Sequence, residues 1–431
     1  MHLENGNQPT VLMVNWSWYP SGGDWTYVTN VQRLYQANGY RVIGLSTKNE
    51  KNVDTGVLTY FVNSPDYKQL NRSKGIKSGF KAVKNSIVNY DALRTLDDIL
   101  NSHSIEVAHL HNIHHYITPA IIWKLKKAGV RILWSLHDYK IICPENSFVS
   151  NNVICEKCIT GHFYHCATNL CKKKSLAASS LAAFEAYFYH KSRIYDKVDA
   201  FLCPSEFLRS KFLQFGFPAQ KLHVTNLCYD LSLIDRFLER NKTESKPLLH
   251  TNNEQYILYV GRIEEIKGIF TLVKAVEQLD LTLVIAGGGA AQEKLEKMIA
   301  SENITNVKFI GFQNKESIFQ LTKNARFTVC PSEWYENYPF SVIESFLLGT
   351  PVIGANIGGI PEMVINDKTG YLFEPGNITD LREKLLQLWN DEPNSIMLGR
   401  NAKEYISEIV NFDNHWNTMK SILNHPIKNE Q

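Results

Sequence analysis

The sequence predicts an α/β protein with two doubly wound, Rossmann-like domains, and three observations support this fold class. Short apolar runs alternate with amphipathic stretches of about ten or more residues, as in a parallel sheet that carries helices on both faces. A chain of 431 residues is too long for one ordinary hydrophobic core. The alternation also lapses once, near the middle of the chain, and then starts again.

The first half begins with a predicted strand at "TVLMVNW" (10–16), a turn at "YPSGGD" and a helix that Gly39 ends. Further strands are predicted at "RVIGLST" (41–47), "IEVAHLHN" (105–112), "RILWSLHD" (131–138), "DAFLCPS" (199–205) and "KLHVTNL" (221–227). Helices are predicted at "PAIIWKLKKAG" (119–129) and around 175–195. We assign residues 1–228 to an N-terminal domain with a cysteine-rich insertion at 143–171.

The second half follows a polar segment, "ERNKTESKPLLHTNNEQ", that has no sustained apolar period. We assign residues 229–253 to a linker and residues 254–409 to a C-terminal domain. Its predicted strands are "YILYVGR" (256–262), "LTLVIAGGG" (281–289), "VKFIGF" (307–312), "RFTVCPS" (326–332) and "TPVIGAN" (350–356). Late helices are predicted at 378–390 and 395–410.

Composition excludes several classes of protein. The formal net charge of +3 is too small to indicate a nucleic-acid-binding protein. No apolar run reaches the roughly 18 residues of a membrane span. The first residues carry acid and amide side chains ahead of a short apolar run, which is not the pattern of a signal peptide. A cytoplasmic enzyme is therefore expected.

Two glutamates, Glu336 and Glu344, occur in "EWYENYPFSVIESFLLGTPVIG" just past a predicted strand. Ligands of doubly wound sheets bind at the carboxyl ends of strands. Pro339 suits the first position of a helix, so a helix is predicted over 339–348. Glu336 then lies in the loop and Glu344 in the helix, where the two carboxylates can converge on one ligand beside a helix N-terminus that favours phosphate. An ordinary pair of surface charges is the alternative.

Other strand ends in this half carry cations and glycines. In "YVGRIEEIKG", Arg262 and Lys267 follow a strand, where two cations can neutralise a diphosphate leaving group. Glycines in "AGGGA" and "GGIPE" let the backbone approach a ligand closely, although a glycine run alone is weak evidence. Taken alone, Arg262 and Lys267 are more often solvated surface charges.

Together these motifs resemble the family-four retaining glycosyltransferases of the GT-B fold. The resemblance lies in "GRIEEIKG", "AGGG", "GFQNKE", "PSEWYENYPFSVIESFLLGTPVI", "GGIPE" and "TGYLFEP", in that order over about 120 residues. The fold implies two Rossmann-like domains that face each other across a cleft. It also implies that residues 410–431 form a C-terminal helix that crosses back to the N-terminal domain.

The resemblance implies roles for the matching residues. Glu336 would contact hydroxyls of the transferred sugar and Glu344 the ribose of the nucleotide, while Arg262 and Lys267 would bind the diphosphate. Backbone near Phe312 and Gln313 would meet the nucleobase, and backbone of Asn337, Tyr338, Pro339 and Phe340 would meet the sugar and phosphates. The "NYP" in this loop departs from the family's small, glycine-bearing segment, which leaves the sugar specificity open.

The N-terminal half resembles the family more loosely. Gly22 and Gly23 in "YPSGGDW" match its glycine-rich loop, and His137 in "SLHDY" matches the histidine that contacts the donor sugar near its reacting carbon. Asp138 is expected to cap the turn. The histidines of "HLHNIHHY" have no acid or cysteine partner nearby in sequence, so we interpret them as lining of the cleft and not as metal ligands.

Four cysteines, Cys155, Cys158, Cys166 and Cys171, fall within seventeen residues. Their spacing could supply four thiolates to a structural zinc ion, with His162 and His165 as spare candidate ligands. An insertion of unlinked thiols is an equal alternative. No metal or other cofactor is expected for the chemistry itself, because the family stabilises its leaving group with side chains and helix ends.

A basic amphipathic segment, "YKQLNRSKGIKSGFKAVKNSI" (67–87), could lie on an anionic membrane surface, although a solvated helix face is the commoner explanation. The function expected overall is transfer of a sugar from a UDP- or GDP-sugar to a glycan or lipid-linked acceptor, in polysaccharide or cell-surface glycan synthesis. A sugar-nucleotide epimerase of the same fold and a non-catalytic nucleotide-sugar-binding protein are the alternatives.

Overall fold

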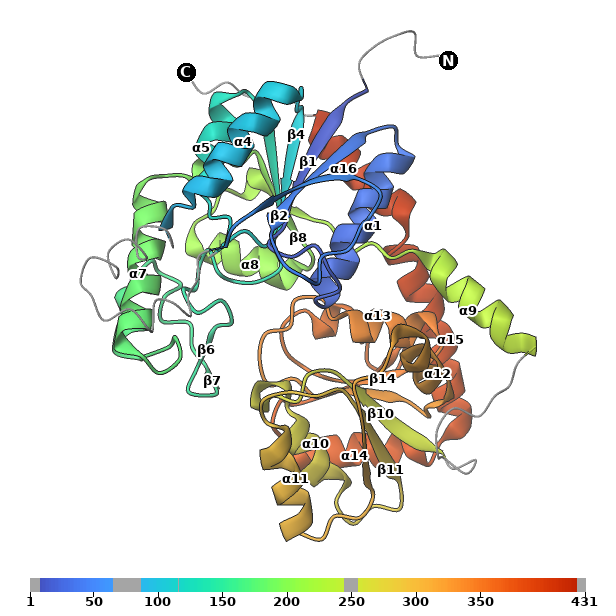
Figure 1. Cartoon of the computed structure of the whole chain (residues 1–431). Coiled ribbons are helices and arrows are strands. Elements are labelled where there is room, and N and C mark those ends of the chain that lie inside the picture. Colours follow the sequence, from blue (N-terminus) through green and yellow to red (C-terminus); the bar gives the residue numbers. More distant parts are fainter. Residues whose placement is uncertain (1–7, 65–86, 115, 244–254, 425–431) are drawn as a thin grey trace.

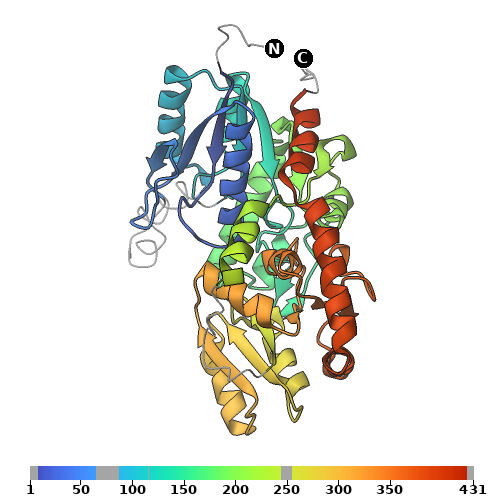
Figure 2. The same cartoon turned by 90° about the vertical axis from the view of Figure 1, so that its right-hand side faces the viewer.

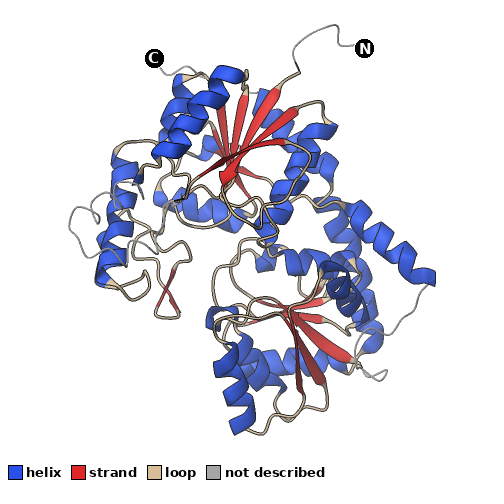
Figure 3. Ribbon diagram, in the orientation of Figure 1, coloured by secondary structure: helices blue, strands red, loops and turns tan. Residues whose placement is uncertain are grey.

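The computed structural model describes residues 8–64, 87–114, 116–243 and 255–424 of the chain. Two fully parallel sheets form the framework, one in each half of the chain, and each is flanked by helices (Figures 1 and 3). This arrangement confirms the predicted α/β fold with two Rossmann-like units.

The N-terminal sheet has seven strands in the order β3-β2-β1-β4-β5-β8-β9. They are β1 (Thr10–Val14), β2 (Arg41–Thr47), β3 (Leu58–Val62), β4 (Val107–Leu110), β5 (Arg131–Ser135), β8 (Ala200–Cys203) and β9 (Leu222–Val224). The accompanying helices are α1 (Gly23–Ala37), α4 (Tyr90–Ser102), α5 (Ile121–Lys127), α7 (Leu176–Lys191) and α8 (Glu206–Phe215). Strand β1 is buried along its whole length, which explains its uninterrupted apolar sequence.

The C-terminal sheet has six strands in the order β12-β11-β10-β13-β14-β15. They are β10 (Tyr256–Val260), β11 (Thr282–Ala286), β12 (Val307–Gly311), β13 (Thr328–Cys330), β14 (Val352–Ala355) and β15 (Gly370–Phe373). The helices are α10 (Ile269–Val276), α11 (Gln292–Ser301), α12 (Lys315–Asn324), α13 (Phe340–Leu347), α14 (Ile378–Trp389) and α15 (Glu392–Ile409). Short 3-10 turns at Glu265–Lys267 and Ile360–Glu362 follow β10 and β14.

The cysteine-rich insertion extends from the N-terminal unit between β5 and α7. It contains an antiparallel hairpin of β6 (Val149–Ser150) and β7 (Val153–Ile154), followed by the short helix α6 (Tyr164–Thr168). In Figure 1 the hairpin lies below the N-terminal sheet and beside the C-terminal unit.

The structure differs from the predicted linker in one respect. The first part of this segment forms a helix, α9 (Leu231–Thr243). Ile234 and Phe237 are buried on one face of this helix, and the Phe237 ring lies 5.4 Å from that of Phe319 on α12. The polar residues around this narrow apolar face concealed it in the sequence. The rest of the predicted linker lies outside the described residues, apart from its start before α9.

The last helix, α16 (Phe412–Asn424), packs against the N-terminal unit, as the resemblance implied. Figure 2 shows α15 and α16 running along one side of the molecule from the C-terminal sheet to the N-terminal one. The Trp416 ring lies 5.9 Å from that of Tyr35 and 5.8 Å from that of Tyr40. Arg131 also donates a hydrogen bond to the Leu423 carbonyl, which ties the helix to the start of β5.

Candidate active site

Glu336 lies in the loop between β13 and α13, at the carboxyl edge of the C-terminal sheet. Its Oε1 accepts hydrogen bonds from Lys267 Nζ at 2.6 Å and from Ser332 Oγ at 2.7 Å. Burial alone would raise the pKa of Glu336, but Lys267 and Ser332 outweigh it and hold the pKa below its ordinary value. The carboxylate is therefore ionised at neutral pH and paired with one of the two predicted diphosphate cations.

Helix α13 begins at Phe340, one residue later than predicted, with Pro339 as its N-cap. Glu344 lies on this helix and is only 6% exposed. Its Oε1 accepts hydrogen bonds from Tyr229 OH at 3.2 Å and from Lys315 Nζ. The two glutamates thus occupy the loop and the helix as predicted. Lys315 was missed because nothing in its local sequence marks it as the partner of a buried carboxylate.

Three more predicted donor residues follow strands of the same sheet edge. Arg262 comes after β10, where its 63% exposed side chain pairs with Glu264 at 2.7 Å. Phe312 comes after β12 and is 91% exposed. The neighbouring Gln313 donates from Nε2 to the Ile310 carbonyl at 2.6 Å. These contacts leave Arg262 and Phe312 turned towards solvent, whereas Lys267 is drawn in against Glu336.

The N-terminal unit contacts this loop directly. The His137 carbonyl, just past β5, accepts a hydrogen bond from Asn337 Nδ2 at 2.7 Å. Across the same junction, a Cβ added to Gly23 would lie 2.7 Å from the Phe340 ring, so a side chain at this position would force the ring or the backbone to shift. Gly22, which precedes α1, has a φ of 145° that residues with side chains rarely adopt. His137 therefore contacts the loop before α13, and Gly23 lies against the first residue of this helix.

The structure also shows the surroundings of Tyr338 and Asp138. Tyr338 is only 4% exposed, so its side chain packs inside and its backbone is the part that remains for a ligand. Asp138 accepts a hydrogen bond from the Lys140 amide at 2.9 Å, the turn-capping contact that was expected of it.

Behind His137 lies a buried chain of ring side chains that the sequence pattern did not reveal. His111 Nδ1 lies 3.1 Å from His137 Nε2, and the His111 ring stacks on that of His109. His109 Nε2 lies 2.8 Å from Ser135 Oγ, which is followed by Tyr27 OH and then His415 Nε2 on α16. The chain thus joins the candidate catalytic histidine to the last helix.

The hydrogen bonds of this chain favour one tautomer of His137. Among the described residues His111 Nε2 is buried and has no hydrogen-bond partner. Burying an unprotonated ring nitrogen without a hydrogen bond costs less free energy than burying an N–H group without an acceptor. We therefore place the His111 proton on Nδ1. His137 Nε2 then accepts that proton's hydrogen bond, and the ring N–H of His137 is on Nδ1.

We expect acid to destabilise the protein through these histidines. Burial lowers the pKa of His109 to about 3 and those of His137 and His415 to about 4. In the unfolded chain, histidine titrates near its ordinary pKa of about 6.5. Between these values the unfolded state binds more protons, so stability is lost as the pH falls, by up to about 1.4 kcal/mol per pH unit for each histidine.

Thermal unfolding measured between pH 7 and pH 5 tests this prediction. The unfolding temperature of the wild type should fall across the interval. His415→Gln, which removes one of the titrating groups, should show a smaller fall. Equal declines for the two proteins would contradict the proposed origin of the acid sensitivity.

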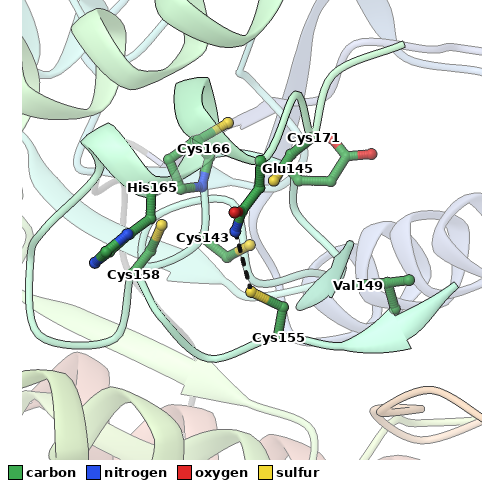
Figure 4. A pocket seen from close by; sticks show the side chains of 10 residues that line it. Cys143, Glu145, Val149, Cys155, Cys158, His165, Cys166 and Cys171 are labelled. Carbon is green, nitrogen blue, oxygen red and sulfur yellow. Dashed lines mark hydrogen bonds between the residues drawn. The ribbon is translucent and has the colours of Figure 1, made fainter. Parts of the chain in front are cut away.

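The insertion brings its cysteines to one small pocket (Figure 4). Its lining includes the four predicted cysteines and His165, one of the two spare candidate ligands, together with Cys143, which was not predicted with them. All of these thiols are free. Within the described ranges, no group of three or more His, Cys, Asp or Glu side chains is arranged to hold a metal ion. The side-chain arrangement therefore lends no support to a structural zinc, which stays a prediction.

Metal analysis of the purified protein, combined with thiol titration, decides between the two interpretations. If zinc is bound, we expect about one equivalent per chain and thiols that become reactive only after chelation. The absence of zinc together with freely titratable thiols would end the zinc hypothesis.

Two parallel sheets, one in each unit, joined by a C-terminal helix that crosses between the units, define the GT-B class of enzymes. Two family models match the chain. "Glycosyltransferase Family 4" matches residues 21–233 and "Glycosyl transferases group 1" matches residues 240–405. The chain belongs to the family-four glycosyltransferases.

Similar proteins are known from curated sequences and solved structures. O-antigen chain mannosyltransferase C of Escherichia coli is 28% identical over 165 residues, which cover 38% of this chain and 44% of that protein. Glycogen synthase of Mycobacterium tuberculosis is 30% identical over 169 residues, covering 38% and 40%. The matches thus span less than half of each of these relatives.

Among solved structures, sucrose-phosphate synthase from Thermosynechococcus elongatus superimposes with a TM-score of 0.69 and 18% identity, covering 96% of this chain and 98% of that one. Anabaena HepE in complex with UDP-glucose gives 0.64 and 17%, covering 96% and 99%. At these identities the similarity shows the fold alone.

Proposed function

We propose that the protein is a retaining glycosyltransferase that moves a sugar from a UDP- or GDP-sugar to a glycan or lipid-linked acceptor. The observation that carries this proposal is the largely buried Glu336–Lys267 pair, whose neighbour Asn337 donates a hydrogen bond to the His137 carbonyl where the two units meet. The pair provides one carboxylate for hydroxyl groups and one cation for phosphate. HepE, which has a similar fold, binds UDP-glucose and supports a nucleotide-sugar donor.

In this proposal the C-terminal unit holds the donor. Glu344 accepts hydrogen bonds from the ribose, and the exposed Phe312 lies beside the base. Arg262, Lys267 and the N-terminal end of α13 stabilise the negative charge that develops on the diphosphate as its bond to the sugar breaks. Glu336 accepts hydrogen bonds from sugar hydroxyls and thereby orients the ring.

The N-terminal unit presents the acceptor. The hydroxyl oxygen of the acceptor bonds to the anomeric carbon of the donor sugar on the face that the diphosphate leaves. A phosphate oxygen of the donor takes the proton of that hydroxyl. His137, neutral because burial lowers its pKa to about 4, offers a ring N–H and a carbonyl near that carbon. No side chain is assigned as a covalent nucleophile, and no metal is assigned to the reaction.

We also propose that the enzyme works at the cytoplasmic face of a membrane, in polysaccharide or cell-surface glycan synthesis. None of the helices in the described part of the chain has the length and apolar character to span a bilayer. The basic segment at 67–87, which suggested peripheral contact with lipid, lies outside the described residues except for Ile87. Binding to vesicles with and without anionic lipid tests the contact.

A panel of UDP- and GDP-sugars tests the proposed function. Nucleotide release should be fast with one donor and should increase when lipid-linked acceptors are added. The new linkage, examined by NMR, should keep the anomeric configuration of the donor. Inversion would contradict the retaining mechanism, and donor binding without turnover would favour a non-catalytic binding protein. The epimerase alternative, which the family assignment does not favour, predicts a changed sugar nucleotide instead of transfer.

A further inference from the structure

The cysteine-rich insertion, residues 143–171, contacts the C-terminal unit at two of its functional loops. Glu156 Oε1 accepts a hydrogen bond from Tyr335 OH at 2.6 Å. The Asn152 side-chain amide, between the two hairpin strands, donates to Glu265. Tyr335 directly precedes Glu336, and Glu265 begins the turn that ends at Lys267. An element outside both sheets thus reaches both loops that carry the buried pair.

Glu156 is held firmly at its end of this contact. It lies between Cys155 and Cys158, which line the insertion's pocket. Its carboxylate also accepts from Lys211 Nζ at 2.6 Å. Burial acts to raise the pKa of Glu156, but Lys211 and Tyr335 outweigh it and lower the pKa, so the carboxylate is ionised at neutral pH. An ionised acceptor makes a stronger hydrogen bond than a neutral one.

Tyr335 is fixed from several sides. Besides its hydroxyl contact, its carbonyl accepts a hydrogen bond from Tyr139 OH at 3.2 Å. Its ring centroid lies 4.8 Å from that of Phe207 and 5.1 Å from Lys211 Nζ. The N-terminal unit therefore holds both the ring and the backbone of the residue before Glu336.

We propose that Glu156 and Tyr335 are positioning residues through which the insertion sets the place of the Glu336 carboxylate. Neither needs to touch the substrate. We call the Glu156–Tyr335 contact the latch. It joins the insertion to the C-terminal unit and orders the loop that meets the donor sugar. The effect on catalysis rests on the proposed role of Glu336, whereas the ordering of the loop does not.

Hydrogen–deuterium exchange of the full-length protein tests the ordering itself. Tyr335→Phe removes one hydroxyl and Glu156→Gln removes one charge, and both keep the shape of the side chain. Peptides covering residues 333–339 should exchange faster in each variant. Tyr335→Phe removes the Tyr335–Glu156 hydrogen bond, whereas Glu156→Gln weakens it and also removes the ion pair with Lys211, so the double variant should exchange about as fast as the faster single variant. Tyr164→Phe, on the insertion's exposed helix α6, is the matched control and should leave these peptides unchanged. Wild-type exchange in both single variants would overturn the proposal.

Kinetics separate positioning from a general loss of structure. With the donor found in the panel, kcat/KM should fall about tenfold in each variant, as expected for loss of a hydrogen bond to a charged group. The Kd for free UDP and GDP should stay within about twofold of wild type, because Glu344 on α13 is not part of the latch. Weaker binding of UDP and GDP together with a lowered unfolding temperature would show a structural role and overturn the proposal.

The two proposals fail in different ways. If the wild type transfers no sugar but residues 333–339 exchange faster in both variants, the proposed transfer reaction is refuted and the latch is supported. An active enzyme whose kcat/KM and loop exchange are unchanged by both substitutions would refute the latch alone.

Discussion

Lys267→Met is expected to lower kcat/KM by about two to three orders of magnitude. The substitution removes a cation assigned to the diphosphate, a loss that costs about a hundredfold or more at comparable sites. It also leaves Glu336 buried without its ion-pair partner, which is among the most destabilising single changes. Donor kinetics and thermal unfolding measure the two effects separately.

The variant should also change the pH dependence of the reaction. Lys267 is the strongest influence that lowers the pKa of Glu336, and burial opposes it. Without the lysine the pKa rises, so the acid limb of the kcat/KM profile should move to higher pH. Adding Glu336→Gln should restore the unfolding temperature but not the activity, because the buried charge is gone and the sugar contact is not rebuilt.

Lys294→Met is the matched control. Lys294 also pairs with a glutamate, Glu265, at 2.7 Å, but its side chain is 66% exposed. An exposed pair contributes little to stability, so kcat/KM and unfolding temperature should stay close to those of wild type. Similar losses in the two lysine variants would contradict a specific role for Lys267.

Glu344→Gln is expected to weaken binding of the free nucleotide about a hundredfold. In this proposal the Glu344 carboxylate accepts hydrogen bonds from two ribose hydroxyls, and a neutral amide is a weaker acceptor. Hydrogen bonds to charged groups contribute about 1.5–3 kcal/mol each to binding. The amide oxygen can still accept from Tyr229 OH, which limits the loss of stability. Calorimetric titration with UDP and GDP measures the change.

Glu383→Ala, at an exposed position on α14, provides the comparison for Glu344 and should bind nucleotide like wild type. If Glu344→Gln bound and turned over donor as wild type does, the ribose assignment would be wrong. A loss confined to kcat, with nucleotide affinity kept, would place Glu344 nearer the sugar than the base.

Much of the fold could be predicted because parallel strands buried on both faces are marked by continuous apolar runs. "TVLMVNW" and "YILYVGR" became β1 and β10, close to their predicted bounds. The helix after Pro339 was placed within one residue, since proline constrains a helix start. Helix α9 was missed because its apolar face is only a few residues wide within a polar segment.

The candidate site was predicted in part for the same kind of reason. Glu336, Lys267 and His137 each follow a strand, and the carboxyl ends of parallel strands share one edge of a sheet. What could not be predicted were their partners, such as Lys315 beside Glu344 or His111 beside His137. Pairing of this kind depends on the arrangement of whole elements in space.

The sequence by itself therefore determined the class of fold and the positions along the chain at which functional groups stand. Only the tertiary structure decided which groups meet. Glu336 and Lys267 are 69 residues apart, Tyr335 and Glu156 are 179 apart, and Tyr27 and His415 are 388 apart. Local periodicity reports the conformation of a few turns, whereas contacts over such separations arise from strand order and from the packing of the two units.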